Sequence, residues 1–197
     1  MTPWNADLFE ELSLFAAEHH RSQEVPNGKG LPYYLHLTQV CNRAMRAAID
    51  RPELDVDLIM ACAILHDVIE DCASTPQLHE EISNEIRHKF GELVLNGVLA
   101  LSKKEILDSS GNRDKAAMMM DSLDRILLQQ HEVWAVKLAD RICNLQPPPP
   151  HWKDKKKLAY LAEAQEIYAA LHPASPILAN ELLHRMKRYK GYINTIE

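Results

Sequence analysis

The sequence predicts an all-α fold in a single domain that spans residues 1–197. Apolar residues recur at helical spacing through nearly every segment, and no stretch of any length alternates as a β-strand does. Only 6 of the 197 residues are glycine, which disfavours a turn-rich all-β protein. A chain of this length can bury a substantial core, and we find no internal repeat.

The helices can be placed in order from apolar spacing and from glycine and proline. The first is predicted over residues 6–20, and a loop with glycines and prolines follows over 25–32. A second helix should begin just after Pro32 and run to about residue 49. A third is predicted over 53–71; its stretch 57–71 is almost wholly apolar in its first half and contains no glycine or proline. The remaining helices are predicted at 76–91, 92–101, 113–130, 133–145, 155–171 and 176–192.

Local signals mark several helix ends. Ser74 and Thr75 before Pro76 have the pattern of an N-cap followed by proline at the first helical position. The four prolines at 147–150 are interpreted as a stiff helix terminator, with a rigid rim that reshapes a pocket as the alternative. The lysine-rich run at 153–157 is interpreted as a solvated face, with contacts to phosphates as the alternative.

Composition narrows the range of functions. The formal net charge of −6 argues against a nucleic-acid partner, although a local basic patch remains possible. No stretch approaches the roughly 20 apolar residues of a membrane span, and the first residues lack the pattern of a signal peptide. The four cysteines form no CxxC pair and are expected to be free thiols, which favours a cytoplasmic protein.

The third helix ends in an unusual polar cluster. His66, Asp67, Glu70 and Asp71 fall within an arc of roughly 140° on one face of a helix with 3.6 residues per turn. Charged groups on a buried helix are unfavourable unless they are paired or bind a metal. Either a metal site or a salt-bridge network is therefore expected here. The salt-bridge alternative needs buried cations that the sequence does not obviously supply.

Two further polar residues interrupt apolar helices. His36 lies near the start of the second helix, and Asp140 is flanked by apolar residues in the helix over 133–145. With His66 and Asp67 they offer two imidazoles and two carboxylates from three helices. Such a mixed set suits Mn²⁺, Fe²⁺, Zn²⁺ or Mg²⁺ rather than a soft metal. A divalent ion bound there would lower the pKa of a water molecule and activate it as a nucleophile.

The order His36, His66-Asp67, Asp140 resembles the H…HD…D signature of the HD-domain metal-dependent phosphohydrolases. Residues 65–71 (LHDVIED) resemble the HDxxED motif of the domains that remove the 3′-pyrophosphate of the alarmones ppGpp and pppGpp. The resemblance runs from about residue 8 to residue 192. Other stretches that agree with the family are His20-Arg21, Pro32-Tyr33, Phe90-Gly91-Glu92, Gly97-Val98 and residues 136–145.

The resemblance implies an HD-type helical bundle and a nucleotide phosphohydrolase. It implies a divalent metal, usually Mn²⁺, held by His36, His66, Asp67 and Asp140. It also implies that Glu70 and Asp71 orient or deprotonate the attacking water, a role that needs hydrogen-bond reach. The residues expected near a small nucleotide substrate are Arg21, Lys103, Asn144 and Tyr160.

The sequence departs from the family around the substrate. Residues 24–26 are Glu, Val and Pro where the family has basic residues, with Lys29 as a possible replacement, and Leu35 stands where the family has Asn. These changes leave the metal ligands intact and put the substrate in question. Two alternatives therefore stay open: an HD phosphohydrolase for another nucleotide, such as a nucleoside monophosphate, or a nucleotide-binding regulatory module without turnover.

Overall fold

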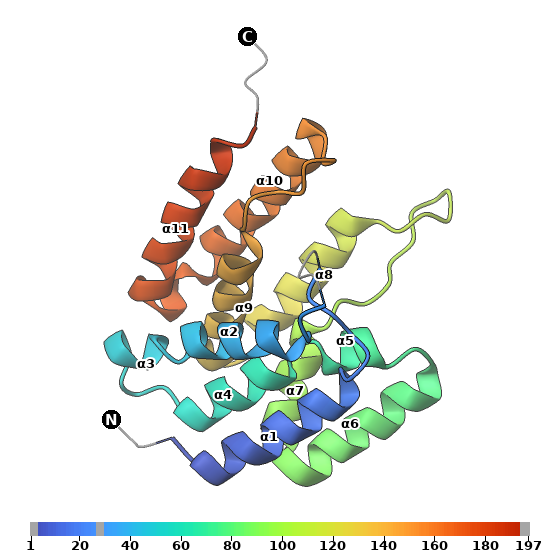
Figure 1. The fold of residues 1–197 in the computed structure, drawn as a ribbon, viewed down its shortest axis with the longest axis vertical. Helices are drawn as coiled ribbons and strands as arrows, with labels where there is room; N and C mark the ends of the chain where they lie inside the picture. Colours follow the sequence, from blue (N-terminus) through green and yellow to red (C-terminus); the bar gives the residue numbers. More distant parts are fainter. Residues whose placement is uncertain (1–3, 27–29, 194–197) are drawn as a thin grey trace.

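The computed structural model describes residues 4–26 and 30–193, and within these ranges the chain is helical (Figure 1). The only β pairing among the described residues is two isolated bridges, so the all-α prediction is confirmed. No helix in the described part of the chain is both long and apolar enough to cross a lipid bilayer. The helices are α1 (Ala6–His19), α2 (Tyr34–Ala44), α3 (Ala47–Asp50), α4 (Val56–Leu65), α5 (Val68–Cys72), α6 (Pro76–Phe90), α7 (Glu92–Leu101), α8 (Lys115–Leu127), α9 (His131–Asn144), α10 (Asp154–Leu171), a 3₁₀ turn (His172–Ala174) and α11 (Pro176–Lys190).

Two helices, α4 and α9, form the centre of the molecule. Every residue of α4 from Leu58 to Leu65 is buried, and α4 packs against α1, α2, α7 and α9. Helix α9 is buried almost throughout and also contacts α2, α10 and α11. In Figure 1, α1, α4, α6 and α7 form the lower part of the molecule and α9, α10 and α11 the upper part. Helix α2 crosses between the two parts, so its inner face is well placed to complete a site with α4 and α9.

Capping residues define several helix starts, and the one at Thr75 was expected from the sequence. The Thr75 hydroxyl accepts a hydrogen bond from the Leu78 N–H at 3.2 Å, with Pro76 in the first turn of α6. Ser175 caps α11 in the same way, with Pro176 following it. These hydroxyls satisfy backbone donors that a helix start leaves without partners. Helix α9 ends at Asn144, before the proline run, as the helix-terminator interpretation predicts.

The prediction of one continuous helix over 53–71 is wrong. Helix α4 ends at Leu65 and α5 begins at Val68, so the chain turns at His66 and Asp67. His66 Nδ1–H donates to the Ala63 carbonyl at 2.8 Å. In an uninterrupted helix that carbonyl would accept from the N–H of Asp67, so the imidazole competes with the backbone ladder. The interruption presents both side chains at the same point of the core.

The second helix also ends earlier than predicted. Helix α2 stops at Ala44 and the short α3 covers Ala47–Asp50. Between them the backbone hydrogen bonds change to the 3₁₀ pattern, in which each N–H bonds to the carbonyl three residues earlier. The Arg46 N–H, for example, donates to the Arg43 carbonyl at 3.0 Å. Apolar spacing does not distinguish this tightened turn from a continuous helix, because side-chain periodicity changes little over one turn.

Gly97 allows α7 to approach the core closely, and Gly97→Ala is expected to lower the free energy of unfolding by about 1–3 kcal/mol. A Cβ at this position would lie 2.6 Å from Cys62 Sγ and 3.0 Å from Val133 Cγ2. Alanine normally favours a helix over glycine by about 1 kcal/mol, so a destabilised variant would show that packing dominates. Urea unfolding measures the effect. Adding Cys62→Ala removes the closest atom and should recover part of the loss, whereas a more stable Gly97→Ala protein would contradict this packing.

Candidate metal centre and adjoining cavities

Three structural elements bring the four candidate metal ligands together. His36 comes from α2, His66 and Asp67 from the turn between α4 and α5, and Asp140 from α9. One ligand atom from each of His36, His66 and Asp67 lies within 4.8 Å of the other two. Asp140 Oδ1 is 3.6 Å from His36 Nε2 and 3.9 Å from His66 Nε2. The residues therefore surround one small volume at the meeting point of α2, α4 and α9.

The geometry of His66 fits a metal ligand. Its Nδ1 donates to a carbonyl, which can only accept, so Nε2 is the nitrogen that offers a lone pair to a metal when the ring gives up its second proton. This Nε2 is buried, and no described residue forms a well-aligned hydrogen bond with it, although Asp67 Oδ2 is 2.9 Å away. Adjacent ligands of an ion at about 2.1 Å lie roughly 3 Å apart. The donor set and its spacing therefore suit a divalent cation.

Neighbouring side chains hold the carboxylates in place. The Tyr33 hydroxyl donates to Asp67 Oδ2 at 2.6 Å, and Asn144 Nδ2 donates to Asp140 Oδ1 at 2.5 Å. Such outer hydrogen bonds orient ligands and tune their affinity for a metal. Tyr33 belongs to the Pro-Tyr motif in the sequence, but the spacing gave no sign that its hydroxyl reaches Asp67.

Lys137 supplies a buried cation that the sequence analysis did not find. Its Nζ lies 3.4 Å from Asp140 Oδ2, one helical turn away on α9, and its side chain is 7% exposed. A lysine three residues before an aspartate was the available signal. The expectation that the sequence supplies no obvious buried cation is therefore wrong for Asp140. One lysine offsets only one of the two carboxylates, so negative potential remains around the imidazoles.

The pKa values of the cluster reflect that potential. Burial by itself lowers the pKa of His66, but Asp67 and Asp140 outweigh it and raise the pKa to about 9. Burial opposes the charge on Asp67, yet His66 and the Tyr33 hydroxyl lower its pKa to about 2. Burial likewise opposes the charge on Asp140, whose pKa is held well below its usual value by Lys137 and the imidazoles. A pocket that attracts a proton this strongly also attracts a metal cation.

Glu70 and Asp71 lie at the edge of the cluster, where each residue keeps exposed surface while its carboxyl group is partly buried. Glu70 Oε2 accepts a hydrogen bond from the Lys103 N–H at 2.7 Å, and Asp71 Oδ2 accepts one from Gln23 Nε2 at 2.7 Å. Partial burial raises the pKa of both carboxyls, and the Lys103 and Gln23 contacts oppose this shift. A carboxylate with a raised pKa is a stronger base at neutral pH.

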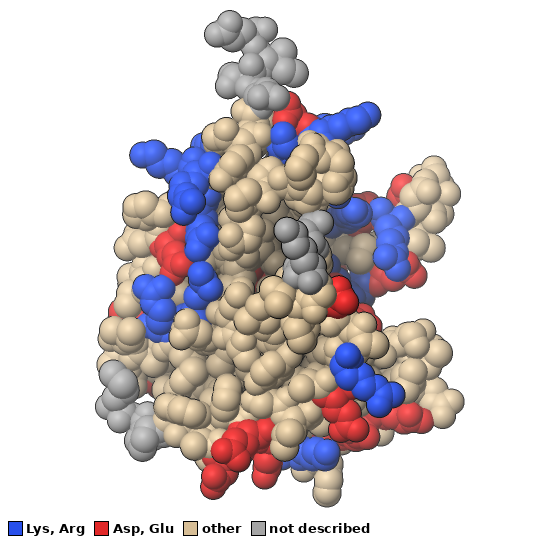
Figure 2. Space-filling view, in the orientation of Figure 1, with Lys and Arg blue, Asp and Glu red and all other residues tan. Residues whose placement is uncertain are grey.

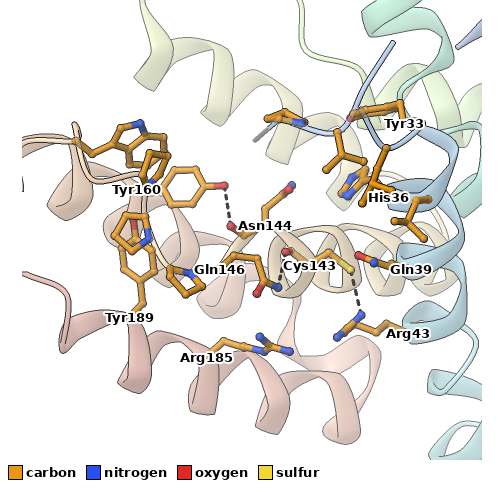
Figure 3. A pocket seen from close by; sticks show the side chains of 18 residues that line it. Tyr33, His36, Gln39, Arg43, Cys143, Asn144, Gln146, Tyr160, Arg185 and Tyr189 are labelled. Carbon is orange, nitrogen blue, oxygen red and sulfur yellow. Dashed lines mark hydrogen bonds between the residues drawn. The ribbon is translucent and has the colours of Figure 1, made fainter. Parts of the chain in front are cut away.

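A cavity of about 880 Å³ opens beside the cluster (Figure 3). His36 belongs both to the cluster and to the cavity wall. Asn144 and Tyr160 line the cavity as expected, and the Tyr160 hydroxyl donates to the Asn144 carbonyl at 3.4 Å. Pro147, Pro148 and Pro149 also line it, so the proline run forms part of the rim as well as following a helix end. The other lining residues are Val25, Pro26, Leu31, Tyr33, Leu35, Gln39, Arg43, Cys143, Gln146, Trp152, Arg185 and Tyr189.

A second cavity of about 340 Å³ contains Glu70 and is rich in cations. Trp152 and Tyr160 line both cavities, so they form a shared wall. Lys156 Nζ lies over the Trp152 ring, 3.9 Å from its centroid, and thus part of the lysine-rich run faces a cavity. The basic residues that line the second cavity are Lys103, Arg113, Lys115 and Lys156.

Not every candidate substrate contact lies at these cavities. Arg21 is exposed just after α1 and lines neither cavity, and Lys29 lies outside the described residues. The structure instead places Trp152, Arg43 and Arg185 at the first cavity. No sequence motif distinguished them, because they come from a loop, α2 and α11, which meet only in the folded chain.

Tyr33→Phe is expected to weaken metal binding by about tenfold, because the variant loses the hydroxyl that holds Asp67 Oδ2. Competition with a fluorescent chelator measures the change in the dissociation constant for Mn²⁺. Tyr34→Phe, at the neighbouring position, serves as the matched control and should bind Mn²⁺ as the wild type does. Equal affinity in Tyr33→Phe and the wild type would show that this hydrogen bond does not support a ligand.

Comparison with known proteins identifies relatives of most of the chain. Residues 13–177 match the family model described as an HD domain. The chain is 32% identical over 170 residues to the GTP pyrophosphokinase rsh of Brucella melitensis, a match that covers 85% of this chain and 20% of that protein. It is 26% identical over 184 residues to the guanosine-3′,5′-bis(diphosphate) 3′-pyrophosphohydrolase MESH1 of Xenopus tropicalis, covering 91% of this chain and 93% of that protein.

The fold itself has a solved counterpart. The structure of a metazoan ortholog of SpoT, described as hydrolysing ppGpp and as acting in starvation responses, superimposes with a TM-score of 0.72. The match covers 98% of this chain and 100% of the other at 22% sequence identity. The whole helical arrangement is therefore shared with that protein.

Proposed function

This chain belongs to the HD-domain family, and we propose that it is a metal-dependent phosphohydrolase that removes the 3′-pyrophosphate of guanosine 3′,5′-bis(diphosphate). The observation that carries the proposal is the position of His36, which is shared by the candidate metal cluster and the wall of an 880 Å³ cavity. The chain spans about a fifth of the Brucella relative and nearly all of the Xenopus one, so we take the activity from the latter.

The proposed metal is a divalent ion, with Mn²⁺ as the first candidate. His36, His66, Asp67 and Asp140 would hold it, and the orphaned lone pair of His66 Nε2 supports this assignment. When bound, such an ion lowers the pKa of a water molecule and offsets charge that develops on phosphate oxygens.

The chain's own residues have distinct proposed roles in the reaction. Water and the bis(diphosphate) give GDP and pyrophosphate, and the proton lost by the attacking water passes to Glu70 or Asp71. The basic residues of the second cavity, which also contains Glu70, would hold the departing pyrophosphate through its negative charge. Asn144 keeps Asp140 oriented, and Tyr160 contributes a wall against which a base can stack.

A second candidate is the same chemistry on another nucleotide, such as a nucleoside monophosphate. It is favoured by the apolar residues Val25, Pro26, Leu31 and Leu35 on the cavity wall, part of which is the loop where the family has basic residues. A mononucleotide places fewer phosphates in such a cavity. Binding of nucleotides without turnover is the third outcome.

The test is a substrate panel with Mn²⁺-loaded protein. Guanosine 3′,5′-bis(diphosphate), guanosine 3′-diphosphate and the common nucleoside monophosphates are incubated separately, and the products are separated by anion-exchange chromatography. The proposal expects GDP and pyrophosphate in equal amounts from the first compound. Release of phosphate from monophosphates alone would favour the second candidate, and tight binding without any product would favour a regulatory module.

We also propose that residues 1–197 work as one HD-type domain on a small nucleotide, without nucleic acid, in the cytoplasm. The described cysteines, Cys41, Cys62, Cys72 and Cys143, are all free thiols. Such thiols are typical of a reducing compartment.

A further inference from the structure

We propose that Arg43 and Arg185 form a second anion subsite in the first cavity, which binds the 5′-diphosphate of the nucleotide. The inference rests on the proposed function for the identity of the substrate, but the subsite itself can be tested without turnover. In this proposal, α2 and α11 supply the positive charge that holds a phosphate group. The described residues 24–26 and 30–32 of the loop before α2 include no lysine or arginine that could do so.

The charge on the cavity wall carries the proposal. Among the described residues that line the first cavity, Arg43 and Arg185 are the only lysines or arginines, and none is a carboxylate. Both are partly shielded from solvent, with side chains 22% and 21% exposed. Positive charge on a partly buried wall that itself carries no carboxylate favours an anionic ligand.

The two arginines belong to a cluster that is short of negative charge. Glu181 on α11 lies 3.3 Å from Arg43 Nε and 3.9 Å from Arg185 through its Oε1 atom. Its other oxygen lies 2.5 Å from Arg46. One carboxylate thus faces three guanidinium groups, two of which line the cavity, so it offsets at most one of the two positive charges on the cavity wall. Figure 2 shows basic side chains following α11 down to α2 on this face of the molecule.

The arrangement of the cavity relates this subsite to the metal cluster. Arg43 lies on α2, two helical turns beyond His36, and its guanidinium donates to Cys143 Sγ at 3.5 Å, one residue before Asn144. Figure 3 shows Arg43 and Arg185 below the α9 residues, while Tyr160 lies at the opposite end, where the wall is shared with the second cavity. The second cavity therefore adjoins the first at its Tyr160 end, away from Arg43.

Two separate basic regions would complement a substrate that carries an anionic group at each end. One such group would reach the lysine-rich second cavity beside Glu70, and the other would reach Arg43 and Arg185. A nucleoside with phosphates on both its 3′ and 5′ oxygens has that charge distribution, whereas a nucleoside monophosphate leaves one region empty. Bidentate contacts from guanidinium groups to phosphate oxygens are short and directional, which suits a diphosphate.

The experiment measures the affinity for GDP, which carries the 5′-diphosphate and nothing to hydrolyse at the 3′ position. Calorimetry compares GDP with guanosine for the wild type and for Arg43→Gln, Arg185→Gln and the double variant. Each single change is expected to weaken GDP binding about tenfold and to leave guanosine unaffected. Arg46→Gln is the matched control, because Arg46 shares the Glu181 contact but does not line the cavity.

Glu181→Gln separates anion binding from a structural role. It breaks the same ion pairs as the arginine variants, but it leaves both guanidinium groups free and should keep or tighten GDP binding. If Glu181→Gln weakens GDP binding as much as the arginine variants do, the arginines act through packing and the subsite is overturned. A wild type that binds GDP no tighter than guanosine overturns it as well. Arginine-dependent GDP binding in a protein that never hydrolyses the bis(diphosphate) would instead retain the subsite and reject the proposed function.

Discussion

Asp67→Asn is expected to release the bound metal and to lower hydrolysis of guanosine 3′,5′-bis(diphosphate) to less than about a thousandth of the wild-type rate. Asp67 Oδ2 lies beside both imidazoles, 2.9 Å from His66 Nε2 and 3.8 Å from His36 Nε2. Changing residues behind a ligand typically costs 10–100-fold in metal affinity, so losing a ligand should cost at least about 100-fold. The catalytic contribution of a metal is several kcal/mol, and about 1.4 kcal/mol corresponds to a tenfold rate.

Elemental analysis of the purified variant and an initial-rate assay measure the two effects. Asp124→Asn, a matched change at an exposed position on α8, is the control and should retain metal and rate. Asp140→Ala should behave as Asp67→Asn does, with an additional loss of stability because Lys137 would lose its buried partner. An Asp67→Asn protein that keeps a full complement of metal would show that this carboxylate is not a ligand.

Glu70→Gln is expected to keep the metal and to lower kcat by about 10²–10⁴, the usual contribution of a positioned general base. Glutamine still offers an oxygen to the Lys103 N–H, so the local fold should survive. It cannot take a proton from water at neutral pH. Metal content and kcat measured on the same preparation distinguish this role from that of a ligand.

Asp71→Asn provides the comparison for Glu70→Gln. Asp71 is held by Gln23, which lies 2.6 Å from His20, so Asp71 belongs to a separate hydrogen-bond chain. If only one of the two variants loses turnover, that carboxylate takes the proton and the other has a positioning role. Loss of metal in Glu70→Gln, or an unchanged kcat in both variants, would contradict the assignment of these residues to the handling of water.

The cluster of candidate metal ligands could be picked out in the sequence because its residues carry chemistry that a buried helix does not otherwise tolerate. His36, His66, Asp67 and Asp140 were polar interruptions of apolar helices, and burial makes such residues conspicuous. The turn at His66 was not predictable in the same way. It depends on the His66 side chain, which replaces a backbone hydrogen bond to the Ala63 carbonyl. The spacing of apolar residues does not predict such a replacement.

The cavity walls were the least predictable part. Arg43 and Arg185 are 142 residues apart, and ordinary charge on a helix surface looks the same in sequence as charge that faces a ligand. The role of the proline run could be predicted only in part. Its composition predicted a helix end correctly, and it left open whether the segment also lines a pocket, because that depends on where α10 and α11 pack.

The most direct test of the central claim follows pyrophosphate release through removal and return of the metal. The protein is stripped with a chelator, assayed with guanosine 3′,5′-bis(diphosphate), and assayed again as Mn²⁺ is added back. We predict no release from the stripped protein, and full recovery of equal amounts of GDP and pyrophosphate once one equivalent of Mn²⁺ is bound. Release that is unchanged by stripping, or a Mn²⁺-loaded protein that never cleaves the 3′ position, would contradict the account.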